Sequence, residues 1–217
     1  IDIRTINHTE EAFSGSAGIN MINADLMLNI PMARNISLQL SGRRSISDIV
    51  QTPTYTEYYN RAFRNTAVTA DATAPVDSLV ESEEVFNFYD VTAKLLIDIT
   101  PKDKLRLSFI DIHNEINYEE NEIINNELES KTSGLEQGTV SGGISYQRLW
   151  NDKLQTNAQI YLSSYSLDAI NFDLRNDQRL IQENSVLDLG IKLDARIALS
   201  STLDLFTGYQ FFEIGIS

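Results

Sequence analysis

The sequence contains no cysteine, which excludes disulfide bonds, thiol catalysis and Cys-based zinc sites. It has only two histidines, His8 and His113, so a His-based catalytic or metal site would have very few ligands to use. Basic residues are also scarce, with 17 Lys and Arg against 31 Asp and Glu and a formal net charge of −14 at pH 7. Because phosphate neutralisation needs clustered Lys and Arg, we expect no binding to nucleic acid.

Long apolar runs are absent as well. No stretch approaches the roughly 18 apolar residues of a transmembrane helix. The N-terminus shows no basic n-region and no apolar h-region, so we expect any targeting signal to have been removed or to lie outside these 217 residues. A membrane β-barrel is not excluded, because its strands alternate and average to a modest hydropathy. The mean hydropathy of −0.22 fits such a barrel and also a soluble β protein.

The dominant pattern is an alternation of apolar and polar residues, which predicts β-strands. In 187–197, for example, Leu, Ile and Ala alternate with a charged row that includes Asp188, Lys192, Asp194 and Arg196. Helical spacing is not sustained outside the predicted loops. With a first strand near 13–21, the sequence predicts about nine strands. The other alternating segments are 24–30, 36–43, 91–99, 105–110, 139–147, 154–163 and 203–211.

The predicted connections are of two kinds. Short turns rich in Pro, Asn, Asp and Ser occur at 31–35, 100–104, 150–153 and 199–202. Longer polar segments at 47–85, 115–135 and 167–184 alternate with them after the third strand. In transmembrane barrels the short turns are periplasmic and the long loops extracellular. This asymmetry therefore favours a barrel in an outer membrane.

Strand length and aromatic residues point the same way. Segments such as 86–100 and 153–166 exceed the usual five or six residues of globular strands. Aromatic residues gather near predicted strand ends, as in the girdles of membrane barrels. A soluble sandwich with these rings in its core and a lipocalin-like barrel with apolar residues inside remain alternatives. The aromatic residues concerned are Phe86, Phe88, Tyr89, Tyr118, Tyr146, Trp150, Tyr165, Tyr209, Phe211 and Phe212.

We therefore expect an all-β, antiparallel up-and-down transmembrane β-barrel with short periplasmic turns and long extracellular loops. Nine is an odd number of strands, and 211–217 ends without a return strand, so we expect these strands to belong to a larger barrel. A small barrel of eight or ten strands is the alternative.

Several runs resemble TonB-dependent outer-membrane receptors of the Bacteroidota type. Ala24-Asp-Leu-Met-Leu-Asn-Ile-Pro31 and Ile36-Ser-Leu-Gln-Leu-Ser-Gly-Arg-Arg-Ser45 resemble their first barrel hairpins, and Ile1-Asp-Ile-Arg4 resembles the end of the strand that joins plug to barrel. Two further runs resemble the strand–turn–strand units of these receptors. They are Phe88-Tyr-Asp-Val-Thr-Ala-Lys-Leu95 with Pro101–Phe109, and Gly143–Trp150 with Asp152–Leu154. The resemblance covers nearly the whole chain.

This resemblance implies that residues 1–8 end a plug-to-barrel connection and that 9–217 form part of a transmembrane barrel. It also implies contact with outer-membrane lipid, coupling to TonB through a plug domain and, as a candidate partner, a surface lipoprotein. These 217 residues contain no plug domain, no TonB box and no terminal aromatic residue, so coupling is expected of the parent protein only. The implied location is the bacterial cell outer membrane.

Candidate contact residues lie in two places. Arg43 is predicted on the polar face, where it would contact a plug, and Arg44 on the other face, where it would contact a lipid phosphate; a structural pair at the membrane boundary is the alternative. The segment 53–65 mixes rings with cations and could grip a ligand or lipoprotein by stacking, or form a short helix over the barrel mouth. The candidates in that segment are Tyr58, Tyr59, Arg61 and Arg64.

The acidic segment 115–129 lacks the ordered spacing of a calcium loop, so we expect a solvated loop and no metal site or cofactor. The leading functional hypothesis is a segment of a transporter that imports a nutrient, namely a glycan, a peptide or a metal chelate. The alternative is a barrel that acts as a structural or docking subunit without transport. An enzyme is not expected, because neither histidine has a well-placed serine. A soluble ligand-binding barrel is the remaining hypothesis.

Overall fold

The computed structural model describes residues 7–47, 49, 53, 79–124, 127–173 and 178–217. Within these ranges, 79–85, 118–124, 127–130 and 173 are described by their backbone alone. Nine strands account for most of this chain, as the alternation predicts. They are β1 (Ser14–Ile19), β2 (Asn23–Ala33), β3 (Ile36–Ser45), β4 (Leu79–Thr100), β5 (Asp103–Ile124), β6 (Glu127–Asn151), β7 (Leu154–Asp173), β8 (Gln178–Ala198) and β9 (Asp204–Ile216).

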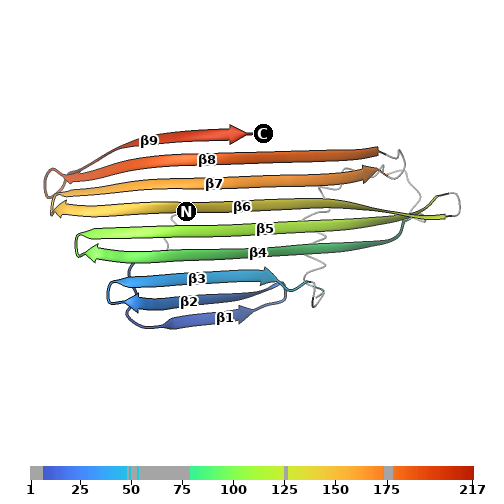
Figure 1. The fold of residues 1–217 in the computed structure, drawn as a ribbon, viewed down its shortest axis with the longest axis horizontal. Helices are drawn as coiled ribbons and strands as arrows, with labels where there is room; N and C mark the ends of the chain where they lie inside the picture. Colours follow the sequence, from blue (N-terminus) through green and yellow to red (C-terminus); the bar gives the residue numbers. More distant parts are fainter. Residues whose placement is uncertain (1–6, 48, 50–52, 54–78, 125–126, 174–177) are drawn as a thin grey trace.

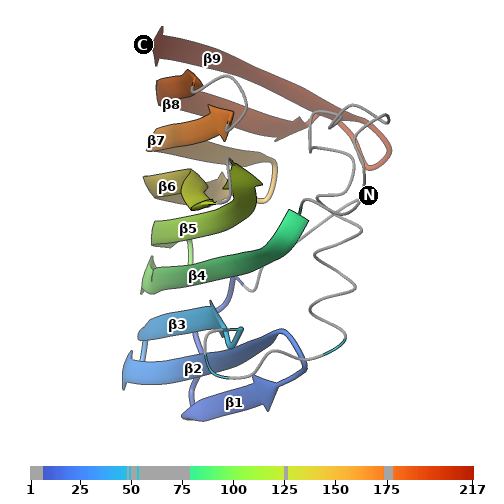
Figure 2. The same cartoon turned by 90° about the vertical axis from the view of Figure 1, so that its right-hand side faces the viewer.

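The strands form one antiparallel up-and-down sheet in chain order, from β1 at one edge to β9 at the other (Figure 1). Figure 2, turned by 90°, shows the strands as a single layer. Among the described residues no helix has the length and apolar character needed to cross a membrane. The predicted strand number and the antiparallel up-and-down topology are therefore confirmed.

Tight turns join the strands at one end of the sheet, which we call the short-turn end. These turns follow β2, β4, β6 and β8 (Figure 1). Polar side chains close them: Thr100 Oγ1 accepts hydrogen bonds from the backbone N–H groups of Lys102 and Asp103, both at 3.1 Å, and Asn151 Oδ1 accepts from those of Lys153 and Leu154. Side-chain acceptors of this kind mimic a backbone turn, which is why the turn residues were recognisable in the sequence.

At the opposite end, the predicted loop boundaries are wrong. Segments 115–135 and 167–184 were expected to be long loops, but most of their residues continue the strands. The pairing of β5 with β6 runs on to Ile124 and Glu127, and that of β7 with β8 runs on to Asp173 and Gln178. These extensions carry polar residues on both faces, so the apolar alternation that marks a half-buried strand is missing from their sequence.

The two faces of the sheet differ in chemistry. One, the polar face, carries Ser37, Lys94, Asp98, Arg106 and their register partners on neighbouring strands. The other, the apolar face, carries the alternate residues. Its members in the half of the sheet nearest the short-turn end are Leu28, Ile30, Leu38, Leu40, Ala93, Leu95, Ile97, Leu105, Leu107, Phe109, Val140, Ile144, Ala158, Ile160, Leu162, Leu187, Leu189, Ile191 and Leu193.

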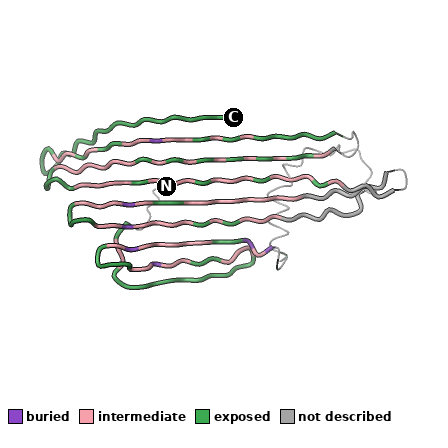
Figure 3. Tube along the Cα trace, in the orientation of Figure 1, coloured by how far each residue is buried: buried purple, intermediate pink, exposed green. Residues whose placement is uncertain are grey.

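Few side chains are buried, as the sparse purple segments of Figure 3 show. Leu96 is the one apolar side chain of the described residues that is buried, and many large apolar residues of the opposite face, among them Ile160 and Leu187, are about half exposed. The accessible surface is 15479 Å². A compact 24.5 kDa monomer would expose roughly 10,000 Å². The apolar face is therefore uncovered in the isolated chain and needs an apolar environment.

The predicted aromatic residues divide between the faces. Tyr89, Tyr146, Tyr209 and Phe211 lie on the apolar face, as a girdle requires. By register, Phe86, Phe88, Tyr165 and Phe212 lie on the polar face and cannot belong to a lipid-facing girdle. The side chain of Tyr118 lies outside the described residues.

Candidate functional site

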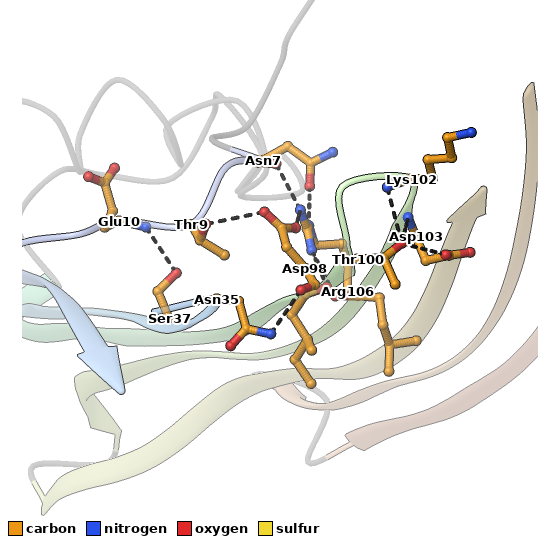
Figure 4. A network of polar contacts seen from close by, with 12 residues as sticks. Asn7, Thr9, Glu10, Asn35, Ser37, Asp98, Thr100, Lys102, Asp103 and Arg106 are labelled. Carbon is orange, nitrogen blue, oxygen red and sulfur yellow. Dashed lines mark hydrogen bonds and ion pairs between the residues drawn. The ribbon is translucent and has the colours of Figure 1, made fainter. Parts of the chain in front are cut away.

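Residues 7–10, which precede β1, lie across the polar face close to the short-turn end (Figure 4). Thr9 Oγ1 donates a hydrogen bond to Asp98 Oδ2 at 3.2 Å, and the backbone N–H of Glu10 donates to Ser37 Oγ at 3.3 Å. Ser37 is completely buried. The N-terminal segment therefore docks on β3 and β4 through polar groups.

Arg106 of β5 holds this segment most firmly. Its Nε donates to the side-chain oxygen of Asn7 at 2.9 Å, and its Nη2 donates to the Asn7 carbonyl at 3.2 Å. The same Nη2 lies 2.6 Å from Asp98 Oδ1 (Figure 4). Arg106 thus links the N-terminal segment to the acidic side chain of the neighbouring strand.

The remaining donors of Arg106 are also used. Nη1 donates to the carbonyls of Ile97 and Leu105, both at 2.9 Å. The Arg106 side chain is only 7% exposed, and Leu96, its register partner on β4, is fully buried. A buried guanidinium is stable only when its donors are paired, and here every guanidinium nitrogen has an acceptor. We call Asn7, Asp98 and Arg106 the Arg106 cluster.

A second polar-face cluster lies on β7, β8 and β9. The ring of Tyr161 lies directly over Gly190, and a Cβ at that position would collide with the ring. Lys192 Nζ lies 5.7 Å from the ring centroids of both Tyr161 and Phe212. The Tyr161 hydroxyl donates to Asp188 Oδ2 at 3.4 Å. Glycine at 190 leaves the space that the tyrosine ring fills, so a larger residue there would displace the ring.

The candidate Arg43 lies on the polar face. Its Nε and Nη2 lie 2.7 and 2.6 Å from Asp90 Oδ2, and its guanidinium lies 5.3 Å from the Phe88 ring centroid. Arg43 is half exposed, and Asp90 is less exposed. Arg44 lies on the apolar face, where its register partners are Ala24 on β2 and Tyr89 on β4. The structure therefore separates the two arginines, and the contacts predicted for them stay predictions.

The remaining candidates of segment 53–65 lie outside the described residues. The contacts proposed for Tyr58, Tyr59, Arg61 and Arg64 therefore stay predictions.

The two histidines have different neighbours and do not contact each other. His8 Nε2 lies 3.2 Å from Glu10 Oε1, whereas His113 stacks on Tyr89 with ring centroids 5.1 Å apart. In the part of the chain that the structure describes, no three His, Asp or Glu side chains form a group that could hold a metal ion.

A further cluster lies on the apolar face at the short-turn end. Arg148 Nη1 is 3.2 Å from Asp103 Oδ1, which also accepts a 2.6 Å hydrogen bond from the Tyr146 hydroxyl. Asp103 Oδ2 accepts from Thr100 Oγ1, also at 2.6 Å. The hydrogen bonds from Thr100 and Tyr146, in that order, lower the pKa of the Asp103 carboxyl, and Arg148 lowers it further. Asp103 is the first residue of β5, at the turn and beyond the apolar row of Leu105.

The sequence placed Asp98 and Arg106 on polar rows but did not single them out. One feature of the sequence could have indicated their contact. Asp98 precedes and Arg106 follows the turn between β4 and β5. Their register partners are Lys104 and Leu96, so the hairpin makes the two opposite charges diagonal neighbours. Nothing in the sequence linked Asn7 to Arg106, because the two residues are 99 positions apart.

No family model matches the sequence, and no curated protein matches it. Solved structures do. Two variants of the ferric enterobactin receptor from Pseudomonas aeruginosa resemble this chain, each at 16% sequence identity, with TM-scores of 0.57 and 0.52. In both, the similarity covers 94% of this chain and 30% of the receptor chain.

At this identity the likeness shows the fold alone. The fold of the nine-stranded sheet resembles about a third of that receptor, in agreement with the fold that the sequence resemblance implies. The Bacteroidota type stays a prediction. Both of these solved chains are named as receptors, and the antiparallel up-and-down sheet has the fold of a segment of an outer-membrane β-barrel.

Proposed function

We propose that this chain is a segment of an outer-membrane TonB-dependent transporter that imports a nutrient. The observation that carries the proposal is the two-faced sheet: a polar face that holds an N-terminal segment, and an uncovered apolar face. In a membrane barrel the apolar side meets lipid and the polar side lines the interior. A soluble protein that exposed this face would leave the apolar rows in water, at a cost of about 25 cal/mol for each Å² of apolar surface.

The N-terminal segment supports the domain assignment within this proposal. Residues 1–8 would end a connection from a plug domain, and 9–217 would form part of the barrel. Asn7, Thr9 and Glu10 lie on the polar face, as expected for a chain that enters the barrel from its interior. TonB would act through the plug, and the outer membrane would be the location. Neither catalysis nor nucleic-acid binding is part of this function.

The cargo class stays open among glycans, peptides and metal chelates. The similar solved receptor is named for a ferric chelate, which makes metal chelates the first class to test. A surface lipoprotein partner is also part of the proposal; Tyr58, Tyr59, Arg61 and Arg64 are candidates for contacting it or the cargo. Arg43 is a candidate for plug contact and Arg44 for lipid contact.

The test uses the native host. We expect the full protein to be found in the outer-membrane fraction and to need detergent for extraction. Deleting its gene should abolish uptake of one radiolabelled cargo class, and a protonophore should abolish uptake in the wild type, because TonB coupling draws on the inner-membrane proton gradient.

The alternative function predicts a different result. A structural or docking subunit would reach the outer membrane, but its deletion would leave the uptake of every cargo class unchanged and would dissociate a co-purifying complex. Extraction by salt or alkali without detergent would contradict both functions.

A further inference from the structure

Arg148 and Trp150 lie at the short-turn end of β6. By register Arg148 is paired with Asp103 and Thr156, in the row next to that of Leu105, Tyr146 and Ala158 on the apolar face. The cation therefore lies at the margin of the apolar rows. In a membrane barrel this margin coincides with the headgroup layer, where Trp and Arg side chains are stable.

The neighbours of Arg148 hold it in one position. Its guanidinium carbon lies 4.4 Å from the Trp150 ring centroid, a cation–π stack. The indole N–H of Trp150 donates to Thr156 Oγ1 at 2.9 Å, which orients the ring. On the other side, Asp103 contacts Nη1 and is itself fixed by Tyr146 and Thr100. The guanidinium plane is thus set before any ligand arrives.

The guanidinium also keeps donors for a ligand. Asp103 contacts a single nitrogen, Nη1. Nε is enclosed and has no hydrogen-bond partner among the described residues. The Arg148 side chain is nevertheless 42% exposed, so a ligand can reach its outer edge. A bound anion would meet the guanidinium at this exposed edge, where a charge-assisted hydrogen bond is strong.

Charge near the cluster suits an anion although the chain as a whole is acidic. The exposed residues Lys102 and Lys153 lie in the β4–β5 and β6–β7 turns, and the backbone carbonyl of Lys102 accepts a hydrogen bond from the backbone N–H of Leu149, next to Arg148. Together with Arg148 they outnumber the two nearby carboxylates, Asp103 and Asp152. The formal charge of the whole chain is −14, so this local excess of positive charge is unusual.

We propose that Arg148 and Trp150 bind the phosphate of an anionic phospholipid in the membrane leaflet at the short-turn end. The proposal rests on the proposed function, because it requires the apolar face to meet lipid. The N–H groups at the exposed edge of Arg148 would donate to phosphate oxygens, the indole would lie at headgroup depth, and the acyl chains would lie along the apolar face. Arginine suits this role better than lysine because its planar fork can make two parallel hydrogen bonds to one phosphate.

The experiment uses the fluorescence of Trp150, the single tryptophan of these 217 residues. The full-length protein and its Trp150→Phe variant are reconstituted into bilayers, and the difference between their spectra isolates the emission of Trp150. Dibrominated phosphatidylglycerol or dibrominated phosphatidylcholine then competes with unbrominated lipid as a quencher. We expect quenching by both lipids, with a relative binding constant about fivefold in favour of phosphatidylglycerol.

Three substitutions sharpen the test. Arg148→Gln should lower the ratio of the two binding constants to about one while quenching persists. Arg148→Lys should retain part of the preference for phosphatidylglycerol. Asp103→Asn should increase the preference, because it removes the competing carboxylate. The matched control is Arg196→Gln. Arg196 also pairs with a carboxylate, Asp204, at 2.6 Å and lies near a ring, Phe206, but on the polar face, so its loss should leave the preference unchanged.

The outcomes separate the two proposals. Absence of quenching by either lipid would show that Trp150 does not meet lipid and would overturn the membrane assignment as well. Equal quenching by both lipids would overturn only the headgroup site. Loss of the preference in inorganic phosphate, but not in chloride of equal ionic strength, would show that the cluster takes a free anion and would overturn the lipid assignment.

Discussion

Arg106 and Arg148 lie on neighbouring strands at the same end of the sheet, yet they occupy opposite environments. Arg106 is on the polar face, is buried, and has an acceptor for each guanidinium nitrogen. Arg148 is on the apolar face, is partly exposed, contacts Asp103 through one nitrogen, and has no acceptor for Nε among the described residues. The comparison shows that a satisfied, buried arginine acts as a structural anchor, whereas a positioned arginine with open donors is suited to a ligand.

The largest effect is expected from Arg106→Met. This change leaves Asp98 Oδ1 and the two acceptors of Asn7 without their donor, although Asp98 Oδ2 keeps the hydrogen bond from Thr9. Removing one partner of a buried ion pair typically costs 3–5 kcal/mol, and because Asp98 keeps some exposure we expect about 3 kcal/mol. Denaturant unfolding of the full-length protein in detergent micelles measures the loss.

The control for that substitution is Arg43→Met. Arg43 pairs with Asp90 on the same face but is half exposed, so its loss should cost about 0–1 kcal/mol. Equal losses for the two variants would contradict the role of Arg106 as an anchor.

A smaller effect is expected from Asn7→Ala, which removes one hydrogen bond to a charged group. We expect a cost of about 1.5 kcal/mol. Because the Arg106–Asp98 contact remains, the strands should keep their amide protection while residues 7–10 exchange faster. Hydrogen exchange followed by mass spectrometry resolves the two regions. Unchanged exchange in 7–10 would argue that Thr9 and Glu10 alone hold the segment.

A still smaller effect on stability is expected from Arg148→Gln, although this variant should lose the lipid preference. Its partner Asp103 keeps hydrogen bonds from Thr100 and Tyr146. The denaturant midpoint in micelles should therefore shift much less than for Arg106→Met. A shift as large as that of Arg106→Met would make Arg148 a structural anchor too, and the difference between the two arginines would disappear.

The smallest effect concerns pH. Asp103 has a lowered pKa in the folded protein, so its contribution to stability is present above the unfolded pKa of about 3.9 and is lost as the pH falls through the lower, folded value. Between about pH 5 and about pH 2, Asp103→Asn should therefore lose slightly less stability than the wild type. Parallel acid titrations of the denaturant midpoint test this. Identical titration curves would show that the hydrogen bonds to the carboxylate do not stabilise its charged form.

Much of the fold was predictable because the sequence of a half-exposed strand alternates between apolar and polar residues every two positions. The rows of 187–197 and 91–99 identify both the strands and their faces, and the turn at Thr100–Asp103 is recognisable from its hydrogen-bonding side chains. The extensions at 115–135 and 167–184 were not predictable from this pattern. Polar residues occur at both alternating positions of these extensions, so the two-residue apolar–polar alternation that marks a strand is missing from their sequence.

The candidate sites were predicted less well. The faces of Arg43 and Arg44 follow from alternation alone, because a side chain's face depends only on its parity within the strand. Which arginine is buried depends on what lies over it. Arg43 and Arg106 share the polar face, but only Arg106 lies beneath residues 7–10. That contact joins distant parts of the chain and has no local signature.

The sequence by itself determined the strands, the alternation of their faces and the turns at one end, since each depends on neighbours a few residues apart. The tertiary structure alone decided that Asn7 meets Arg106, that Tyr161 fills the space over Gly190, and that Trp150 covers Arg148 while Asp103 holds its edge. These contacts depend on strand register and on chain segments brought together by pairing. A residue's hydropathy and its position in the chain do not specify either one.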